Sequence, residues 1–213
     1  FITDARTAEL CKLTENAFRD VNIAFANELS MICQELNINV WELIKLANRH
    51  PRVNILEPSP GVGGHCIAVD PWFIVASAPK QANLIKMARQ VNKKKTEYIV
   101  QQVKQQVVSL NSPIIACLGL AFKADIDDLR ESPSVKIVEQ LVASSLGKIM
   151  VVEPYINQLP PSLNNFDIEL TSLEIAINEA NLILILVNHK QFYSIPQKML
   201  DGKVIIDTRG VLN

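Results

Sequence analysis

The segment Pro113-Ile114-Ile115-Ala116-Cys117-Leu118 marks the point at which the pattern of this sequence changes. Before it, apolar residues recur mainly at helical spacing. After it, short apolar runs alternate with amphipathic segments of helix length. Strands that alternate with helices predict a doubly wound parallel sheet, with helices on both faces. The sequence therefore predicts a helical part, 1–111, followed by a small Rossmann-like α/β domain, 112–213.

Periodicity also predicts the individual elements. In the helical part, uninterrupted apolar stripes predict one long helix at about 8–36 and another from Pro79 to near residue 111, with a shorter helix at 40–48 between them. The run 67–76, after a glycine-rich turn, can begin a further helix. In the α/β part we expect strands at 113–118, 148–152, 182–187 and 204–207, and helices at 133–146 and 173–179.

Composition excludes several classes of function. The chain has 213 residues, 48% of them hydrophobic, which is enough for a globular core. The net charge of -1 gives no overall field for nucleic acid or an anionic membrane, and no apolar run is long enough to span a bilayer. Four cysteines without metal-like spacing predict a cytoplasmic protein with reduced thiols and no metal site. The start at Phe1, without a methionine, suggests that upstream sequence is missing.

The segment Gly-Val-Gly-Gly-His-Cys-Ile-Ala-Val-Asp-Pro, residues 61–71, is the first candidate site. Its glycines, including Gly63, let the backbone approach a ligand closely. A cysteine at a helix start is favoured as thiolate, which would make Cys66 a nucleophile. In a helix, Asp70 would lie one turn later on the same face and could act as a base, and His65 could tune the thiolate. The alternative is a buried, unreactive cysteine beside a connecting turn.

The second candidate is a polar stripe on the first helix. Lys12 and Asn16 are four residues apart and therefore share one face, where they could stabilise negative charge that develops on an oxygen. Asp20 and Asn27 could extend this stripe. The alternative interpretation is a solvated helix face without chemistry.

Cations near the carboxyl ends of predicted strands form a third candidate. Lys123 follows the first strand and Arg130 precedes the next helix, where phosphate would be bound favourably, and Arg209 follows the last strand. The alternative is that Lys123 and Arg130 only pair with the acidic residues around them. We assign no role to His50 or His189. No Gly-x-Gly-x-x-Gly stands between a strand and a helix, so this chain alone is not expected to hold NAD well.

Together these motifs closely resemble the family of nucleotide-sugar 6-dehydrogenases, which includes the UDP-glucose and GDP-mannose enzymes. The residues that carry the resemblance are 8–13 with Asn16 and 27–28, 61–66 with 70–71, and 119–123 with 127–132. Residues 50–54, His65 and 70–72 look most like the branch that oxidises UDP-N-acetyl-D-mannosamine. The resemblance covers the family's central and C-terminal parts and not its N-terminal NAD-binding domain.

The resemblance implies the following roles. The family oxidises a sugar primary alcohol to a carboxylate with two NAD in succession. By this likeness Cys66 is the nucleophile that forms a thiohemiacetal and then a thioester, Asp70 and Lys12 activate water or stabilise charge, and Asn16 helps to hold the oxygen. The remaining residues implied are Lys123, His65, Gly63 and Arg209 for the UDP-sugar substrate, Arg130 for NAD, and Arg52 for the active site of a neighbouring subunit.

The resemblance also implies a homodimer formed through the helical part, with the long helix after Pro79 as the dimerisation helix, although an ordinary intramolecular helix buries the same kind of surface. Three other functions stay open. They are a non-catalytic sugar-nucleotide-binding module, a thiol hydrolase that uses Cys66 without a nicotinamide, and a family member acting on UDP-N-acetylglucosamine or UDP-glucose.

Overall fold

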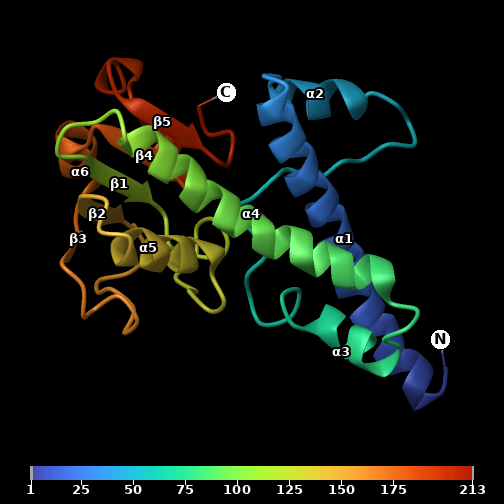
Figure 1. The fold of residues 1–213 in the computed structure, drawn as a ribbon. Helices are drawn as coiled ribbons and strands as arrows, with labels where there is room; N and C mark the ends of the chain where they lie inside the picture. The colour runs from blue at the N-terminus through green and yellow to red at the C-terminus, as the bar shows by residue number, and fades with distance from the viewer. Residues whose placement is uncertain (1, 213) are drawn as a thin grey trace. The chain divides into compact units, whose positions relative to one another are not determined.

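The computed structural model describes residues 2–212 and divides into two compact units (Figure 1). The first unit extends to Lys95 and the second begins at Thr96, so the division falls inside helix α4 (Asn83–Val107). The predicted boundary near residue 111 lies just after this helix, which ends at Val107. The division falls earlier because Ile99 and Val103 of α4 are fully buried in the core of the second unit.

The first unit consists of helices and connecting turns. Its elements are α1 (Ala5–Glu35), α2 (Val40–Ala47), α3 (Asp70–Ser77) and the first part of α4. Helix α1 begins after Asp4, whose carboxylate accepts a hydrogen bond from the Thr7 amide, and neither Gly nor Pro interrupts its 31 residues. The two long helices and the short α2 confirm the predicted helical pattern.

The second unit contains a five-stranded sheet in which every pair of neighbouring strands is parallel. The strand order is β3-β2-β1-β4-β5, so the chain reverses its direction of travel across the sheet between β1 and β4. Ligands of such sheets bind at the carboxyl ends of the strands near this reversal. The strands are β1 (Ile114–Leu118), β2 (Lys148–Val152), β3 (Ile168–Leu170), β4 (Leu182–Ile185) and β5 (Val204–Asp207).

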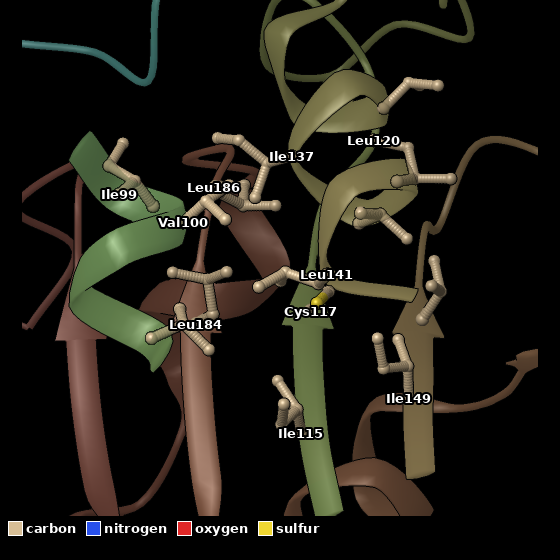
Figure 2. Close-up of a cluster of buried hydrophobic side chains, with 14 of the residues drawn as sticks. Ile99, Val100, Ile115, Cys117, Leu120, Ile137, Leu141, Ile149, Leu184 and Leu186 are labelled. Atoms are coloured by element: carbon tan, nitrogen blue, oxygen red, sulfur yellow. The ribbon is translucent and has the colours of Figure 1, made fainter. Parts of the chain in front are cut away.

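Both faces of this sheet are covered, which confirms the doubly wound prediction. One face packs against α5 (Pro133–Ala143) and the second part of α4 through buried residues such as Ile99, Cys117 and Ile137 (Figure 2). The other face packs against α6 (Leu173–Glu179), and against Phe192 in a 3-10 helix (Lys190–Ser194) followed by another (Gln197–Met199). Within the described residues, no helix combines the length and the apolar character that crossing a membrane requires.

Apart from shifted ends, such as α5 ending at Ala143 and β4 at Ile185, two differences from the prediction concern whole elements or the site. Strand β3 was not expected, because it has only three residues and the middle one is Glu169. Helix α3 begins at Asp70, whereas the sequence placed a helix start near Ile67; residues 66–69 form a turn instead. This second difference changes the setting of Cys66.

Candidate functional site

Cys66 lies in the turn that precedes α3, and its side chain is half-buried. Its carbonyl accepts hydrogen bonds from the amides of Val69, at 3.0 Å, and Asp70, at 2.8 Å. The Asp70 bond has helical spacing, so Asp70 follows Cys66 by one turn although the helix itself starts only at Asp70. The prediction of a cysteine at the helix start is therefore corrected to a cysteine one turn before it.

Two glycines of the turn before Cys66 have positive φ, Gly61 at 155° and Gly64 at 82°. Gly64 has a φ of 82°, a conformation that L side chains rarely adopt, whereas Gly63 does not require positive φ. His65, beside it, is exposed. Gly64 thus sets the direction in which the chain enters the Cys66 turn, and the half-buried Gly63 leaves backbone within reach of a ligand.

Helix α1 brings two further predicted residues to this turn. The amide Nδ2 of Asn16 donates to Oδ2 of Asp70 at 2.6 Å, which fixes the carboxylate against α1. Lys12, one turn earlier on α1, is exposed, and its Nζ lies 3.0 Å from Oε2 of Glu15. The hydrogen bond and charge of Glu15 raise the pKa of Lys12, and Cys66 and Asp70 contribute weaker attractions of the same sign. Lys12 is therefore a cation at neutral pH within electrostatic range of the thiol.

The other cysteines differ from Cys66 in exposure. Cys33 and Cys117 are buried, and burial raises the pKa of the Cys33 thiol and that of the Cys117 thiol, the latter to about 12. Such groups stay protonated and do not act as nucleophiles. Cys11 is exposed and precedes Lys12 on α1. Among the cysteines, only Cys66 and Cys11 are accessible for chemistry.

Asp20 and Asn27 share one face of α1 with Lys12 and Asn16, as their spacing predicts, but they are not exposed. Both side chains are fully buried and make hydrogen bonds toward α4 and toward Ser59. The shared polar face therefore changes from exposed at Lys12 to fully buried at Asp20 and Asn27.

In the second unit, the loop after β1 presents Lys123. Gly119 begins this loop with a φ of 95°, and a Cβ at this position would lie 2.4 Å from Cβ of Val187. Glycine is therefore required where the loop passes the end of β4. Lys123 is exposed, and within residues 2–212 no hydrogen bond or ion pair holds its ammonium group.

A buried network that the sequence did not reveal fixes this loop. The carboxylate of Glu153, directly after β2, accepts hydrogen bonds from the amides of Leu120, at 2.7 Å, and Ala121, at 2.9 Å. Nδ1 of His189 accepts from the Asp125 amide at 2.9 Å, so its Nε2 carries the proton and donates to Glu153 at 3.1 Å. A charged residue immediately after an apolar strand was the available signal for Glu153.

The Glu153 network depends on an ionised carboxylate. Burial by itself raises the pKa of Glu153, but the hydrogen bonds from His189 and from the two amides outweigh it, so the pKa lies below its ordinary value of 4.5. The stabilisation that this network provides is therefore complete above pH 4.5 and is lost as the pH falls through the lowered pKa.

The remaining predicted cations are placed as follows. Arg130 makes a bidentate pair with Asp128, with Nη2 2.6 Å from Oδ2, as the alternative of local charge pairing predicted. Arg209 donates from Nη2 to the side chain of Asn188 at 3.0 Å, at the carboxyl ends of β4 and β5. Arg52 is exposed, and its amide donates to His50.

The described residues do not form a metal site or a dinucleotide site of the usual kind. No group of three or more His, Cys, Asp or Glu side chains in residues 2–212 is placed to hold a metal ion. The amides after the first strand, which hold the pyrophosphate in dinucleotide domains, are occupied by Glu153 in this sheet. Because of this internal carboxylate, the residues of the second unit do not fit NAD at that position.

Comparison with known proteins matches each part of the chain to a domain of one family. Residues 6–94 match the central domain of the UDP-glucose/GDP-mannose dehydrogenase family, and residues 116–213 match its UDP binding domain. The chain is 60% identical over 210 residues to an NDP-N-acetyl-D-galactosaminuronic acid dehydrogenase of Ralstonia nicotianae, covering 99% of this chain and 49% of the relative. It is also 60% identical over 195 residues to a UDP-N-acetyl-D-mannosamine dehydrogenase of Campylobacter jejuni, covering 91% of this chain and 48% of that relative.

Solved structures of the family have the same fold. A UDP-D-ManNAc dehydrogenase from Pyrococcus horikoshii matches with a TM-score of 0.86 and 36% identity, over 100% of this chain and 50% of that one. A UDP-N-acetyl-mannosamine dehydrogenase from S. aureus matches with a TM-score of 0.83 and 42% identity, over 99% of this chain and 49% of that one. The chain thus spans about half the length of the relatives that it matches.

Proposed function

Because this chain belongs to the UDP-glucose/GDP-mannose dehydrogenase family, we propose that it supplies the catalytic cysteine and the UDP-sugar site of an NAD-dependent nucleotide-sugar 6-dehydrogenase. The observation that carries this proposal is the cluster in the first unit, where an accessible Cys66 lies beside the hydrogen-bonded pair Asn16 and Asp70 and within the electrostatic range of Lys12. Such a cluster contains a nucleophile, a carboxylate and two groups that stabilise an oxyanion.

The chemistry assigned to this cluster is the second half of an alcohol oxidation. The Cys66 sulfur attacks the carbonyl carbon of the sugar aldehyde and forms a thiohemiacetal, and loss of a hydride from that carbon leaves a thioester. Lys12 and Asn16 stabilise negative charge on the oxygen in these steps. Asp70 then orients and deprotonates the water that hydrolyses the thioester, releasing the carboxylate and the free thiol.

The hydride acceptor in this chemistry is NAD, and two molecules are reduced for each sugar oxidised. Because the sheet of this chain does not fit a dinucleotide after β1, we assign NAD binding mainly to a domain outside this chain. Arg130 is the residue of this chain assigned to face NAD, and it would have to release or share its partner Asp128 to do so.

The second unit is assigned to the nucleotide part of the substrate. Lys123 is exposed at the carboxyl end of β1, next to the reversal in strand order, and its unpartnered ammonium suits a diphosphate. Arg209 is assigned a further contact with the nucleotide sugar. His65 and Gly63 are assigned to the sugar side, and Arg52 to the active site of a neighbouring subunit.

UDP-N-acetylmannosamine is the proposed substrate, and UDP-N-acetylgalactosamine is the second candidate. The first follows from the residues that resemble the mannosamine branch, and from 60% and 54% identity to the enzymes of C. jejuni and Escherichia coli (strain K12). The second follows from the same 60% identity to the Ralstonia relative. Initial rates of NADH formation by the intact gene product with these two sugars, UDP-N-acetylglucosamine and UDP-glucose would identify the substrate.

Binding by this chain alone tests the division of labour between domains. By isothermal titration we expect the chain to bind UDP and the UDP-sugar but to give no measurable heat with NAD. Tight NAD binding by this chain would contradict the assignment. UDP-sugar binding without any oxidation by the intact gene product would support a binding module, and cofactor-independent ester or thioester cleavage that is lost in Cys66→Ala would support a thiol hydrolase.

A homodimer formed through the helical unit is part of the same proposal. The resemblance implies α4, the helix after Pro79, as the dimerisation helix, and Leu84 and Met87 in its first part are 68% and 56% exposed. Helix α1 adds a second apolar surface, where Phe18, Phe25 and Ile32 are spaced seven residues apart and are 71%, 55% and 46% exposed. The apolar residues in the second part of α4, in contrast, are mostly buried in the second unit. A stripe with this spacing suits pairing with the same helix of a second copy.

Charge reversal on this stripe tests the dimer. We expect the parent to elute with the mass of a dimer in size-exclusion chromatography with light scattering, and Phe25→Asp to shift it to a monomer, because a carboxylate in an apolar interface loses its hydration. Phe166→Asp introduces the same charge on an exposed residue of the second unit and should leave the dimer intact. A parent that is a monomer at all concentrations would refute the proposal.

A further inference from the structure

A buried polar network connects α1 with α4 and continues to the segment before the glycine turn. Oδ1 of Asp20 accepts from Nη1 of Arg89 at 2.6 Å and from Nδ2 of Asn92 at 2.8 Å. Nδ2 of Asn27 donates to Oδ1 of Asn92 at 2.9 Å, and Oδ1 of Asn27 accepts from the amide of Ser59 at 2.7 Å. All of these residues belong to the first unit.

Donor and acceptor are fixed in every hydrogen bond of this network. The carboxylate of Asp20, paired with Arg89, can only accept, so Asn92 must turn its NH2 group toward it. This leaves Oδ1 of Asn92 to accept from Asn27, and the oxygen of Asn27 to accept from Ser59. The charge of Asp20 therefore sets the orientation of both amide side chains. The last hydrogen bond of the network is the one from the backbone amide of Ser59.

The backbone amide at the end of this network belongs to the segment that delivers Cys66. Ser59 Oγ donates to the carbonyl of Gly61 at 2.7 Å, and the chain then passes through the left-handed Gly64 to Cys66. The far end of the segment is held by the bond from Asn16 to Asp70. Helix α1 therefore holds the segment 59–70 on both sides of Cys66.

We propose that Asn27 is a positioning residue, which through Ser59 fixes the Cys66 turn against the face of α1 that carries Lys12 and Asn16. The proposal rests on the function proposed for Cys66 and extends its machinery to a residue that touches no reactant. A misplacement of about 1 Å at a reacting group costs on the order of 100-fold in rate, so a fixed turn matters. The network also leaves Oδ2 of Asp20 and Nε of Arg89 buried and without a partner among the described residues, so it is poorly arranged for stability alone.

The first experiment measures the anchor itself. In Asn27→Leu the Ser59 amide and Asn92 Oδ1 both lose their partner. Asn27→Leu/Asn92→Leu removes the unpaired oxygen of Asn92, and it also removes the hydrogen bond that Asn92 donates to Asp20, whose Oδ1 keeps its bond from Arg89. In both variants we expect hydrogen exchange of a peptide covering 55–66 to accelerate about tenfold, the effect of one lost hydrogen bond, while the α1 and α4 peptides of the double variant stay protected. Parent-level exchange of this peptide in the double variant would overturn the proposal.

Ser30→Ala is the matched control. Ser30 is buried on the same helix, donates to the carbonyl of Asn27 at 2.6 Å and accepts from Nζ of Lys95 at 2.8 Å, but it makes no bond to the Ser59 segment. This variant loses two buried hydrogen bonds and should leave exchange at 55–66 unchanged. Accelerated exchange at 55–66 in Ser30→Ala would show a general loosening of the unit, which would overturn an assignment specific to Asn27.

The second experiment measures the consequence for catalysis in the intact gene product. We expect the double variant to lower kcat by roughly 100-fold and to leave KM for the UDP-sugar nearly unchanged, because the nucleotide is assigned to the second unit. A normal kcat with accelerated exchange would overturn the positioning role. An inactive parent would refute the proposed dehydrogenase, whereas the exchange experiment would still decide whether Asn27 holds the turn.

Discussion

Replacement of Cys66 by serine in the intact gene product should lower formation of the sugar acid by a factor of roughly 10³ or more, the scale of loss when a covalent nucleophile is removed. The half-buried thiol is the group assigned to attack the aldehyde carbon, and a serine hydroxyl at the same place is a much weaker nucleophile at neutral pH. Binding of the UDP-sugar should be retained, because the substitution removes no group of the second unit. NADH formation and isothermal titration measure the two effects separately.

Cys11→Ser is the matched control for this substitution. Cys11 is the other accessible cysteine, and it lies next to Lys12 on α1, so a general effect of losing a thiol near the site would appear there too. We expect this variant to keep the parent's rate. Normal acid formation by Cys66→Ser, or a large loss in Cys11→Ser, would remove Cys66 from its assigned role.

The second large effect is expected for Lys12→Ala, which should lower kcat by roughly 100-fold or more, the scale of one lost oxyanion contact. Glu15 holds the ammonium group by an exposed ion pair of 3.0 Å, which is weak enough for the group to turn toward a developing negative charge. Because Glu15 raises the pKa of Lys12, the loss should be the same across the neutral pH range rather than depend on titration of the lysine. Steady-state kinetics from pH 6 to 9 would measure it.

Arg19→Ala provides the comparison for Lys12. Arg19 is also an exposed cation on α1, but it is not part of the cluster at Cys66. The substitution Arg19→Ala should have little effect on kcat. Such a result would exclude a general contribution of positive charge on this helix. A near-normal rate for Lys12→Ala, or an equal loss in both variants, would contradict the role assigned to Lys12.

The architecture could be predicted because most elements carry a strong local signal. The bounds of β2, α6 and β5 agree with the predicted ranges residue for residue. Strand β3 escaped prediction because three residues are too few to show a period. The start of α3 was misplaced because an apolar run does not distinguish a hydrogen-bonded turn from the first turn of a helix.

The candidate site was predictable only where residues are close in sequence. The spacing of Asn16 on one helix and of Asp70 beside Cys66 indicated polar groups, but their 2.6 Å hydrogen bond joins residues 54 positions apart. Glu153 with His189, and Asn27 with Ser59, are likewise long-range pairs, and neither partner has a local pattern that reveals the other. Asn27 lies on the predicted face of α1, but its burial was not predicted, because helical spacing gives the relative directions of side chains and not how deeply each is buried.

The sugar is expected to become covalently attached to Cys66 during oxidation, and acid quenching tests this most directly. The intact gene product would be mixed with UDP-sugar and NAD, quenched in acid within milliseconds to seconds, and digested for mass spectrometry. We predict an acyl adduct of the nucleotide sugar on the peptide that contains Cys66, and none on this peptide in Cys66→Ser. Acid formation at the normal rate with every Cys66 peptide unmodified, or with the adduct on Cys11, would contradict the account.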